Sequence, residues 1–184
     1  DEQDLDVLAE ATVLMPLVTG GSGLGQALPA QYRAQGWLAT ITEPGRLSPA
    51  SGGGLVLSGS CSRATLAQVA DFLAKHPDGG FALDPLALAE GEQQQTQALA
   101  FARQRLSEQA PVLIYASAEP TNVAAAQQAL GAARAGQVVE EALSQLAVTL
   151  VDEGVGRLLV AGGETSGAVV SALGINTLRI GEQI

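Results

Sequence analysis

The fold class is decided by one stretch, Leu159-Val160-Ala161-Gly162-Gly163-Glu164-Thr165-Ser166-Gly167-Ala168-Val169-Val170. An aliphatic run enters a turn of glycines and hydroxyl residues, and the turn opens a helix-like segment, which is the strand-loop-helix pattern of a parallel sheet. Such a turn directs free backbone N–H groups and two hydroxyls toward one point in space. An anion suits that point, and the stretch therefore predicts a phosphorylated ligand.

A second stretch repeats this device: Gly54-Leu55-Val56-Leu57-Ser58-Gly59-Ser60-Cys61-Ser62-Arg63-Ala64-Thr65-Leu66. Serines surround Gly59 at the end of the predicted strand, and Arg63 adds a cation. The pattern favours a ligand-binding loop, and simple capping of the helix that begins near Thr65 remains the alternative. Because the carboxyl ends of parallel strands share one edge of a sheet, we expect both loops at that edge.

Other motifs of phosphate-binding proteins are absent or incomplete. The segment Thr19-Gly20-Gly21-Ser22-Gly23-Leu24-Gly25 lacks the spacing G-x-G-x-x-G, and no acidic residue ends a second strand about 20 residues later, so a tight strand-to-helix turn is favoured over a dinucleotide site. The sequence contains no G-x-x-x-x-G-K-[ST], which excludes an ordinary Walker A loop. Glu164 is read either as a residue that helps to organise Mg²⁺ or as a solvent-exposed side chain.

Aliphatic runs without polar interruption predict buried parallel strands. The predicted strands cover Met15–Thr19, Leu55–Ser58, Val112–Ala116 and Arg157–Ala161, with a shorter one at Phe81–Leu83 and an additional one at Trp37–Ile41. Apolar residues three or four positions apart predict helices over Thr65–Lys75, Gln93–Gln109, Val138–Asp152 and Ser166–Leu173. The expected fold is α/β: a mostly parallel sheet flanked by helices in three layers, with an N-terminal piece of a second α/β domain.

Two segments read as connectors. Residues 42–54 contain two prolines, four glycines and two serines, which predicts a linker and a domain boundary. The run Gly131–Gly136 predicts a flexible point between helices. Residues 1–41 are therefore expected to be the tail of a preceding domain, and residues 55–184 the main domain.

Charge and composition limit the classes of molecule that this chain is expected to bind. Nineteen acidic and nine basic side chains give a formal charge of −10, which argues against nucleic acid and anionic membranes as partners. A phosphorylated ligand would then be held by backbone amides, hydroxyls, a divalent metal for which Mg²⁺ is expected, and one or two arginines. The sequence has no apolar run of about 20 residues and no secretory signal, so a cytoplasmic location is expected.

Nucleophilic and transition-metal chemistry are not favoured. The single cysteine, Cys61, lies near a predicted helix N-terminus, but the only histidine, His76, falls in a Pro/Gly turn at the far end of that helix. Cys61 is therefore read as a small loop residue and His76 as a surface turn residue. Clusters with metal-ligand spacing are absent, so no transition-metal site is expected.

Taken together, the loops resemble a known family. Leu57-Ser58-Gly59-Ser60-Cys61-Ser62-x-x-Thr65-x-x-Gln68, with Ala161-Gly162-Gly163-Glu164-Thr165-Ser166-Gly167-Ala168-Val169 and Leu178-Arg179-Ile180-Gly181, is similar to the four-carbon acid sugar kinases. These enzymes phosphorylate threonate, erythronate or 3-oxo-tetronate with ATP. The resemblance implies that ATP is contacted by Ser60, Ser62, Gly162, Gly163, Thr165 and Ser166.

The resemblance also implies a domain plan. Residues 1–41 would be the C-terminal part of the acid-sugar domain, 42–54 the linker, and 55–184 a nucleotide-binding domain that is incomplete at its C-terminus. The chain lacks the family's N-terminal Asp-Asp-x-Thr-Gly motif and its C-terminal Lys-Ser-Gly-x-Phe-Gly segment, so this chain is not expected to catalyse alone and no catalytic residue is assigned. A non-catalytic nucleotide or phosphorylated-ligand module, and an α/β domain whose glycines serve only turns, remain as alternatives.

Overall fold

The computed structural model describes residues 1–39, 49–116 and 120–178, the last range with side chains from residue 123 onward. The chain divides into two compact units. The first comprises residues 1–47 and 179–184, and the second comprises residues 48–178. The candidate site belongs to the second unit.

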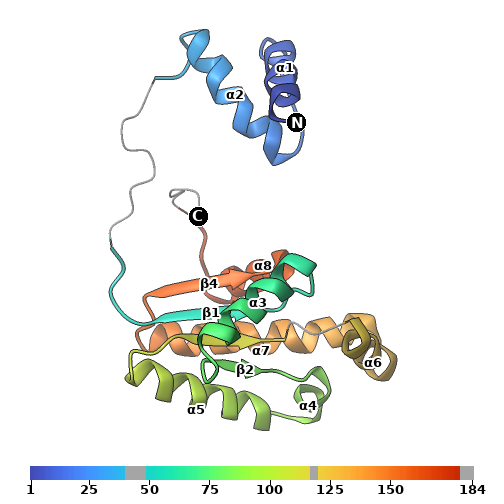
Figure 1. Cartoon of the computed structure of the whole chain (residues 1–184), viewed down its shortest axis with the longest axis vertical. Helices are drawn as coiled ribbons and strands as arrows, with labels where there is room; N and C mark the ends of the chain where they lie inside the picture. Colours follow the sequence, from blue (N-terminus) through green and yellow to red (C-terminus); the bar gives the residue numbers. More distant parts are fainter. Residues whose placement is uncertain (40–48, 117–119, 179–184) are drawn as a thin grey trace. The chain divides into compact units, whose positions relative to one another are not determined.

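The second unit is built on a four-stranded sheet (Figure 1). Its strands are β1 (Gly54–Ser58), β2 (Gly80–Ala82), β3 (Val112–Tyr115) and β4 (Arg157–Ala161). The strand order is β2-β3-β1-β4, and each neighbouring pair is parallel. Leu57 in β1 pairs with Ile114 on one side and with Val160 on the other. The predicted α/β class with a parallel sheet is confirmed.

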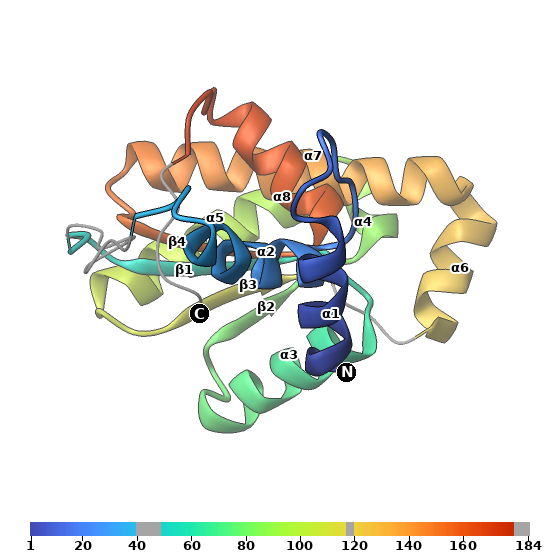
Figure 2. The same cartoon turned by 90° about the horizontal axis from the view of Figure 1, so that it is seen from above.

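Helices connect the strands and cover the sheet. They are α3 (Arg63–Lys75), α4 (Pro85–Glu90), α5 (Gln93–Ser107), α6 (Pro120–Leu130), α7 (Ala132–Asp152) and α8 (Gly163–Ala172). Seen from above, α3 lies on one side of the sheet, and α5 and α7 lie on the other (Figure 2). The four helices expected from the sequence are all present, with boundaries shifted by up to six residues.

The main core fills the space between the sheet and α7. Alternate residues of the central strands point into it, among them Leu57 in β1 and Ile114 in β3, and both are fully buried. From α7 they meet Leu143, Leu146 and Leu150, whose spacing of three and four residues puts them on one face of the helix. Burial of one such side chain stabilises the fold by about 1.5–3 kcal/mol, so this layer holds the strands whose ends carry the site.

The opposite face of the sheet is covered unevenly. Leu113, which alternates with the core residues of β3, is buried there, as is Val69 of α3. Leu159 in β4 lies on the same face as Leu113, and 48% of it is exposed. In the described structure, therefore, the α3 face is closed over the middle of the sheet and open over β4.

The first unit contains two helices within residues 1–39, α1 (Glu2–Thr12) and α2 (Ser22–Ala34). The predicted strand at Met15–Thr19 is wrong, because this segment is an irregular connection and none of the described strands pairs with it. Leu17 in this connection is 80% exposed, and Pro16 has no N–H to give to a ladder. The aliphatic run resembles a buried strand, but nothing among the described residues covers it.

The strand predicted at Trp37–Ile41 is also wrong for its described part. The backbone N–H of Trp37 donates to the carbonyl of Tyr32 at 2.9 Å, and the two rings lie 6.1 Å apart. Trp37 is therefore part of the turn that closes α2. Residues 40–41 lie outside the described residues.

The two predicted connectors differ in outcome. Gly131, with φ +82°, is the link between α6 and α7, but Ala132–Gly136 form the first turns of α7, so the predicted flexible segment there is wrong. Small residues favour a helix here because α7 buries Ala135 against the domain. Of the predicted linker, residues 42–48 lie outside the described residues, 49–53 have no regular structure, and Gly54 begins β1.

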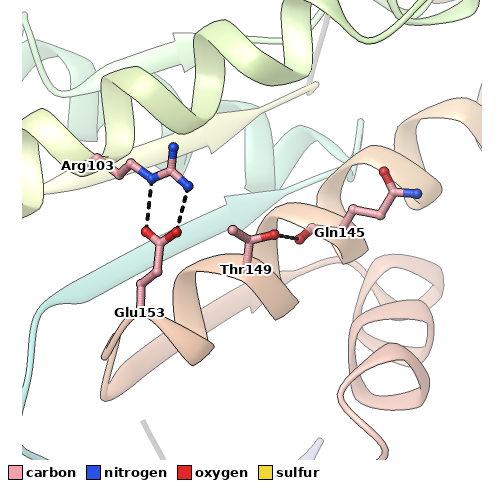
Figure 3. Close-up of polar contacts among 4 residues, drawn as sticks. All are labelled: Arg103, Gln145, Thr149 and Glu153. Atoms are coloured by element: carbon pink, nitrogen blue, oxygen red, sulfur yellow. Dashed lines mark hydrogen bonds and ion pairs between the residues drawn. The ribbon is translucent and has the colours of Figure 1, made fainter.

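An ion pair joins α5 to the end of α7. Arg103 donates from Nε and Nη2 to the two carboxylate oxygens of Glu153, at 3.0 and 2.6 Å (Figure 3). One turn earlier in α7, the hydroxyl of Thr149 donates to the carbonyl oxygen of Gln145 at 2.9 Å. Glu153 precedes β4, so this pair lies on the amino-terminal side of the strands, opposite the carboxyl edge that carries the loops.

Candidate functional site at the carboxyl edge of the sheet

A crevice of about 780 Å³ opens where the strands end. Every strand contributes to its lining through the residues at or after its carboxyl end: Gly59 and Cys61 from β1, Leu83 to Leu86 from β2, Tyr115 and Ala116 from β3, and Glu164 and Thr165 from β4. The chain leaves β1 toward α3 on one face, and α7, which comes between β3 and β4, lies on the other (Figure 2). The crevice therefore lies at the switch point of the sheet, where open α/β folds bind ligands.

The long walls of the crevice are apolar. On one side, α3 presents Leu66, Val69 and Leu73, which share one face of that helix. On the other side stand Val123 and Ala126 of α6 with Val139 of α7. Such walls suit a flat, weakly polar ring system rather than a charged group.

The charged groups of the crevice are acidic. Asp84, Glu140 and Glu164 line it, and no lysine, arginine or histidine does so within the described part of the chain. The Asp84 carboxylate accepts the backbone N–H of Leu86 at 2.9 Å and so caps α4. An anionic ligand would therefore meet carboxylates unless backbone N–H groups or a cation offset their charge.

Those N–H groups are supplied by α8. Its N-cap is Gly162, which offers no side-chain hydrogen bond, and its first helical hydrogen bond runs from the Ser166 N–H to the Gly162 carbonyl at 2.9 Å. The N–H groups of Gly163, Glu164 and Thr165 precede that bond and have no partner inside the helix. Gly162 itself has φ +120°, a conformation that favours glycine. The arrangement is suited to binding an anion.

The loop after β1 is organised differently. Ser62 is the N-cap of α3: its hydroxyl accepts the Thr65 N–H at 3.2 Å and lies 2.9 Å from the Thr65 hydroxyl. The hydroxyl of Ser60 accepts the Ser62 N–H at 3.2 Å, so its proton remains able to donate to a ligand. Capping, the alternative raised by the sequence, therefore describes Ser62, and Ser60 is the serine of this loop with a donor to spare.

The two loops meet closely at the edge of the sheet. The backbone N–H of Gly59 donates to the Ala161 carbonyl at 3.2 Å, which extends the pairing of β1 and β4 into the loops. A Cβ added at Gly162 would lie 3.2 Å from the Cβ of Ser60. The structure thus brings together the two stretches that the sequence singled out.

The six predicted contact residues fall into distinct positions. Thr165 is 96% buried and lines the crevice, whereas Ser60, Ser62, Gly162, Gly163 and Ser166 border it without forming its lining. Ser166 is half-buried on the first turn of α8, and its N–H is already used within the helix, so only its hydroxyl can reach a ligand. Cys61 is exposed at one end of α3 and His76 lies at the other, as expected.

Sequence reasoning missed most of the apolar wall. Val123 and Ala126 lie on α6, a helix that was not predicted, and the alanine-rich run before Leu130 carries little periodic signal. Leu66 and Val69 were recognised as one face of a helix, but their part in a crevice depends on what α6 leaves uncovered. Pro120 at the start of α6 was the available signal for a helix there.

The fold and the crevice define a class: a parallel α/β domain with an uncapped helix N-terminus, suited to an anion, beside an apolar cleft, as in nucleotide-binding domains. Residues 55–184 match a family model described as a nucleotide-binding C-terminal domain. The chain belongs to this family, the C-terminal nucleotide-binding domain of the four-carbon acid sugar kinases.

Individual relatives support this family assignment. The chain is 51% identical to a Burkholderia multivorans protein named 3-oxo-tetronate kinase and 50% identical to a Pseudomonas fluorescens protein of the same name, over 100% of this chain and 42% and 41% of those proteins. It is 34% identical to a Haemophilus influenzae protein of known crystal structure, with a TM-score of 0.72, over 100% of this chain and 43% of that one. The chain thus spans about two fifths of the length of the curated relatives it matches.

Two further observations concern the described residues alone. None of their helices has the length and apolar character required to span a membrane. Three or more side chains of His, Cys, Asp or Glu do not gather anywhere among them in a way that could hold a metal ion.

Proposed function

We propose that this chain is the ATP-binding part of a kinase that phosphorylates a four-carbon acid sugar: threonate, erythronate or 3-oxo-tetronate. The observation that carries the proposal is the uncapped N-terminus of α8 beside Ser60 at the carboxyl edge of the sheet. The family match and the relatives named 3-oxo-tetronate kinase support it. Consistent with the acidic charge, the proposed partners are ATP and the small acid sugar, not nucleic acid or membrane, and the proposed location is the cytoplasm.

The crevice fits a nucleotide in one orientation. The phosphates would lie at α8, where the N–H groups of Gly163, Glu164 and Thr165 and the hydroxyls of Ser60 and Ser166 donate hydrogen bonds. The base would lie between the apolar walls formed by α3 and α6, which tolerate its ring and exclude water. The volume of about 780 Å³ is within the usual range for a ligand pocket.

Mg²⁺ fits the chemistry of this donor set. Glu164 and Asp84 line the crevice with carboxylate oxygens, the ligands that Mg²⁺ prefers, and the absence of a cation among the described lining residues leaves the phosphate charge to be offset. Bound Mg²⁺ would neutralise charge on the phosphates during transfer. Ser62 and Gly162 would contribute by fixing the conformation of the loops around the phosphates.

For the reaction, this chain would bind and orient the phosphates and keep water away from the transferred group. N–H groups fixed by α8 would stabilise charge that develops on the phosphate without having to reorganise. The acceptor hydroxyl and any general base are not assigned to this chain, and we propose that the chain alone is inactive.

Calorimetric titration with ATP, with and without Mg²⁺, tests the proposal, with threonate and erythronate as control ligands. We expect ATP to bind, Mg²⁺ to strengthen binding, and the acid sugars to give no signal. Ser166→Ala should weaken ATP binding while the melting temperature stays nearly constant, because the hydroxyl is half-buried and the backbone bond is retained. No ATP binding by the wild-type chain would support the alternative of a domain whose glycines serve only turns.

A further inference from the structure

We propose that Thr165 is a positioning residue, whose buried side chain sets the distance between the loop after β1 and the N-terminus of α8. This inference rests on the proposed function, because its consequence is measured as ATP affinity. It departs from the resemblance, which makes Thr165 a direct contact of ATP, only for the side chain: the Thr165 N–H remains a phosphate donor, and its hydroxyl is assigned to packing. The two roles differ in what the Thr165 side chain contacts: ATP in the resemblance, and the loop after β1 in this proposal.

The Thr165 side chain fills the space between the two loops. Thr165 is 4% exposed, although it is the third residue of α8 and its neighbours Gly163 and Glu164 are exposed. A Cβ added at Gly59 would overlap the Oγ1 of Thr165 and lie 3.5 Å from its Cβ. A Cβ added at Gly162 would lie 3.2 Å from the same Oγ1. Thr165 is thus packed against both loops at the positions where each loop carries a glycine.

Beneath this contact lies the rigid core. The added Cβ at Gly59 would also lie 3.3 Å from Cδ1 of Leu143, which is fully buried in α7. Gly59 is therefore confined between Leu143 on one side and Thr165 on the other. A residue confined in this way transmits a change at Thr165 to Ser60, its neighbour in sequence, because close-packed interiors do not absorb displacement.

The proposed phosphate site needs both loops at a fixed separation. The hydroxyl of Ser60 comes from one loop and the N–H groups of α8 from the other, so a phosphate can bridge them only within the narrow range of separations that hydrogen bonds allow. Threonine suits the spacer position because its branched Cβ carries a methyl group besides the hydroxyl, which fills more of the gap than serine does and restricts rotation about χ1. In this view, the Thr165 hydroxyl packs against Gly59 and Gly162 and does not bind the nucleotide.

A complementary pair of substitutions tests the contact. Gly59→Ala should weaken ATP binding by about tenfold or more, because the new methyl group pushes the loops apart. Thr165→Ala should weaken it less, because it leaves a gap that the loops close in part. The double variant G59A/T165A should bind ATP more tightly than either single variant, because the methyl group of residue 59 then occupies the space of the missing Oγ1.

Calorimetric titration with Mg²⁺-ATP is the measurement, and thermal unfolding without nucleotide is run on each variant. Ser171→Ala, exposed near the end of the same helix, is the matched control and should leave the ATP affinity unchanged. If Gly59→Ala does not fold, Thr165→Ser decides: a several-fold loss of affinity supports positioning, because the hydroxyl is retained and only the branch is lost. Wild-type affinity in Thr165→Ser overturns it.

The outcomes separate the two proposals. Rescue in the double variant supports positioning, since removal of a direct ligand cannot be repaired by a methyl group on the opposite loop. Losses that add without rescue, with wild-type ATP binding intact, overturn the positioning role and leave the proposed function standing. Absence of ATP binding by the wild-type chain overturns both.

Discussion

The guanidinium of Arg103 in α5 holds both carboxylate oxygens of Glu153, the residue that caps the end of α7 (Figure 3). The two residues are far apart in the sequence, and their pairing joins two of the helices that pack on one face of the sheet. Hydrogen bonding from Arg103, aided by the attraction of its charge, lowers the pKa of the Glu153 carboxyl from its ordinary value. The same hydrogen bonds raise the pKa of Arg103.

The pair makes stability depend on pH in one direction. Because the pKa of Glu153 is lowered in the folded chain, its contribution is complete above the unfolded value of about 4.3 and is lost as the pH falls through the folded value. Glu153→Gln should therefore lower the melting temperature slightly at neutral pH, and the difference from wild type should vanish in acid. Thermal unfolding followed by circular dichroism across this range checks it.

The control for this prediction is Glu90→Gln. Glu90 is an exposed carboxylate at the end of α4, and it has no ion pair in the described structure. Its replacement should leave the pH profile of the wild-type chain unchanged. A difference between wild type and Glu153→Gln that persists unchanged into acid would contradict the assignment.

Substitutions at Ser62 separate its capping role from its part in the proposed nucleotide site. Ser62→Ala removes the acceptor for the Thr65 N–H and should lower the free energy of unfolding by about 1 kcal/mol. Ser62→Asp keeps a good N-cap and should retain most of the stability, but its charge near the proposed phosphates should weaken ATP binding. Urea unfolding and ATP titration of both variants measure the two effects. Equal ATP affinity in Ser62→Asp and wild type would count against phosphates at this loop.

Adjacent glycines at the start of α8 should respond differently to the same change. Gly162 has φ +120° and little space beside Ser60, so Gly162→Ala should lower the free energy of unfolding by about 1–2 kcal/mol and weaken ATP binding. Gly163 has no heavy atom within 4 Å of an added Cβ, so Gly163→Ala should leave stability equal or slightly higher. Chemical denaturation of the two variants and of wild type measures this difference in the free energy of unfolding. Equal losses would mean that the conformation of Gly162 is not required.

The apolar wall formed by α6 should affect binding of the nucleotide base of ATP and should not affect folding. Val123 lines the crevice, whereas its neighbour Ala124 is exposed and does not. Val123→Asp should weaken ATP binding by about tenfold, because a carboxylate in the wall repels both the ring and the phosphates. Ala124→Asp carries the same charge on the same helix and should bind ATP like wild type. The prediction fails if the two variants have the same affinity.

The sequence predicted the sheet of the second unit because its strands are short aliphatic runs. Leu55–Ser58 and Arg157–Ala161 matched β1 and β4 to within one residue. The same signal failed at Met15–Thr19, since an aliphatic run becomes a strand only where another strand can pair with it. Whether a partner exists is decided by the rest of the chain, and a local pattern does not contain that information.

The candidate site was predictable in its polar half. Glycines and serines after strands identified both loops, because their conformation and hydrogen bonding are encoded locally. The separate roles of the residues inside the loops were not predictable. Ser62 caps a helix, the hydroxyl of Ser60 keeps a proton free to donate, and Thr165 is buried. These roles follow from how two loops from distant parts of the chain pack together, and the apolar wall depends on the position of α6 in the same way.

The contact between Gly59 and Thr165 also has a consequence for the order of folding. These residues are separated by about a hundred positions, and β4 is the last strand to join a sheet whose other members precede it in the chain. A nascent chain that ends before residue 157 can bury much of the α5 and α7 core, yet it holds only part of the proposed nucleotide site. ATP binding would therefore serve as a late reporter of refolding, because it requires the pairing with the longest loop to close.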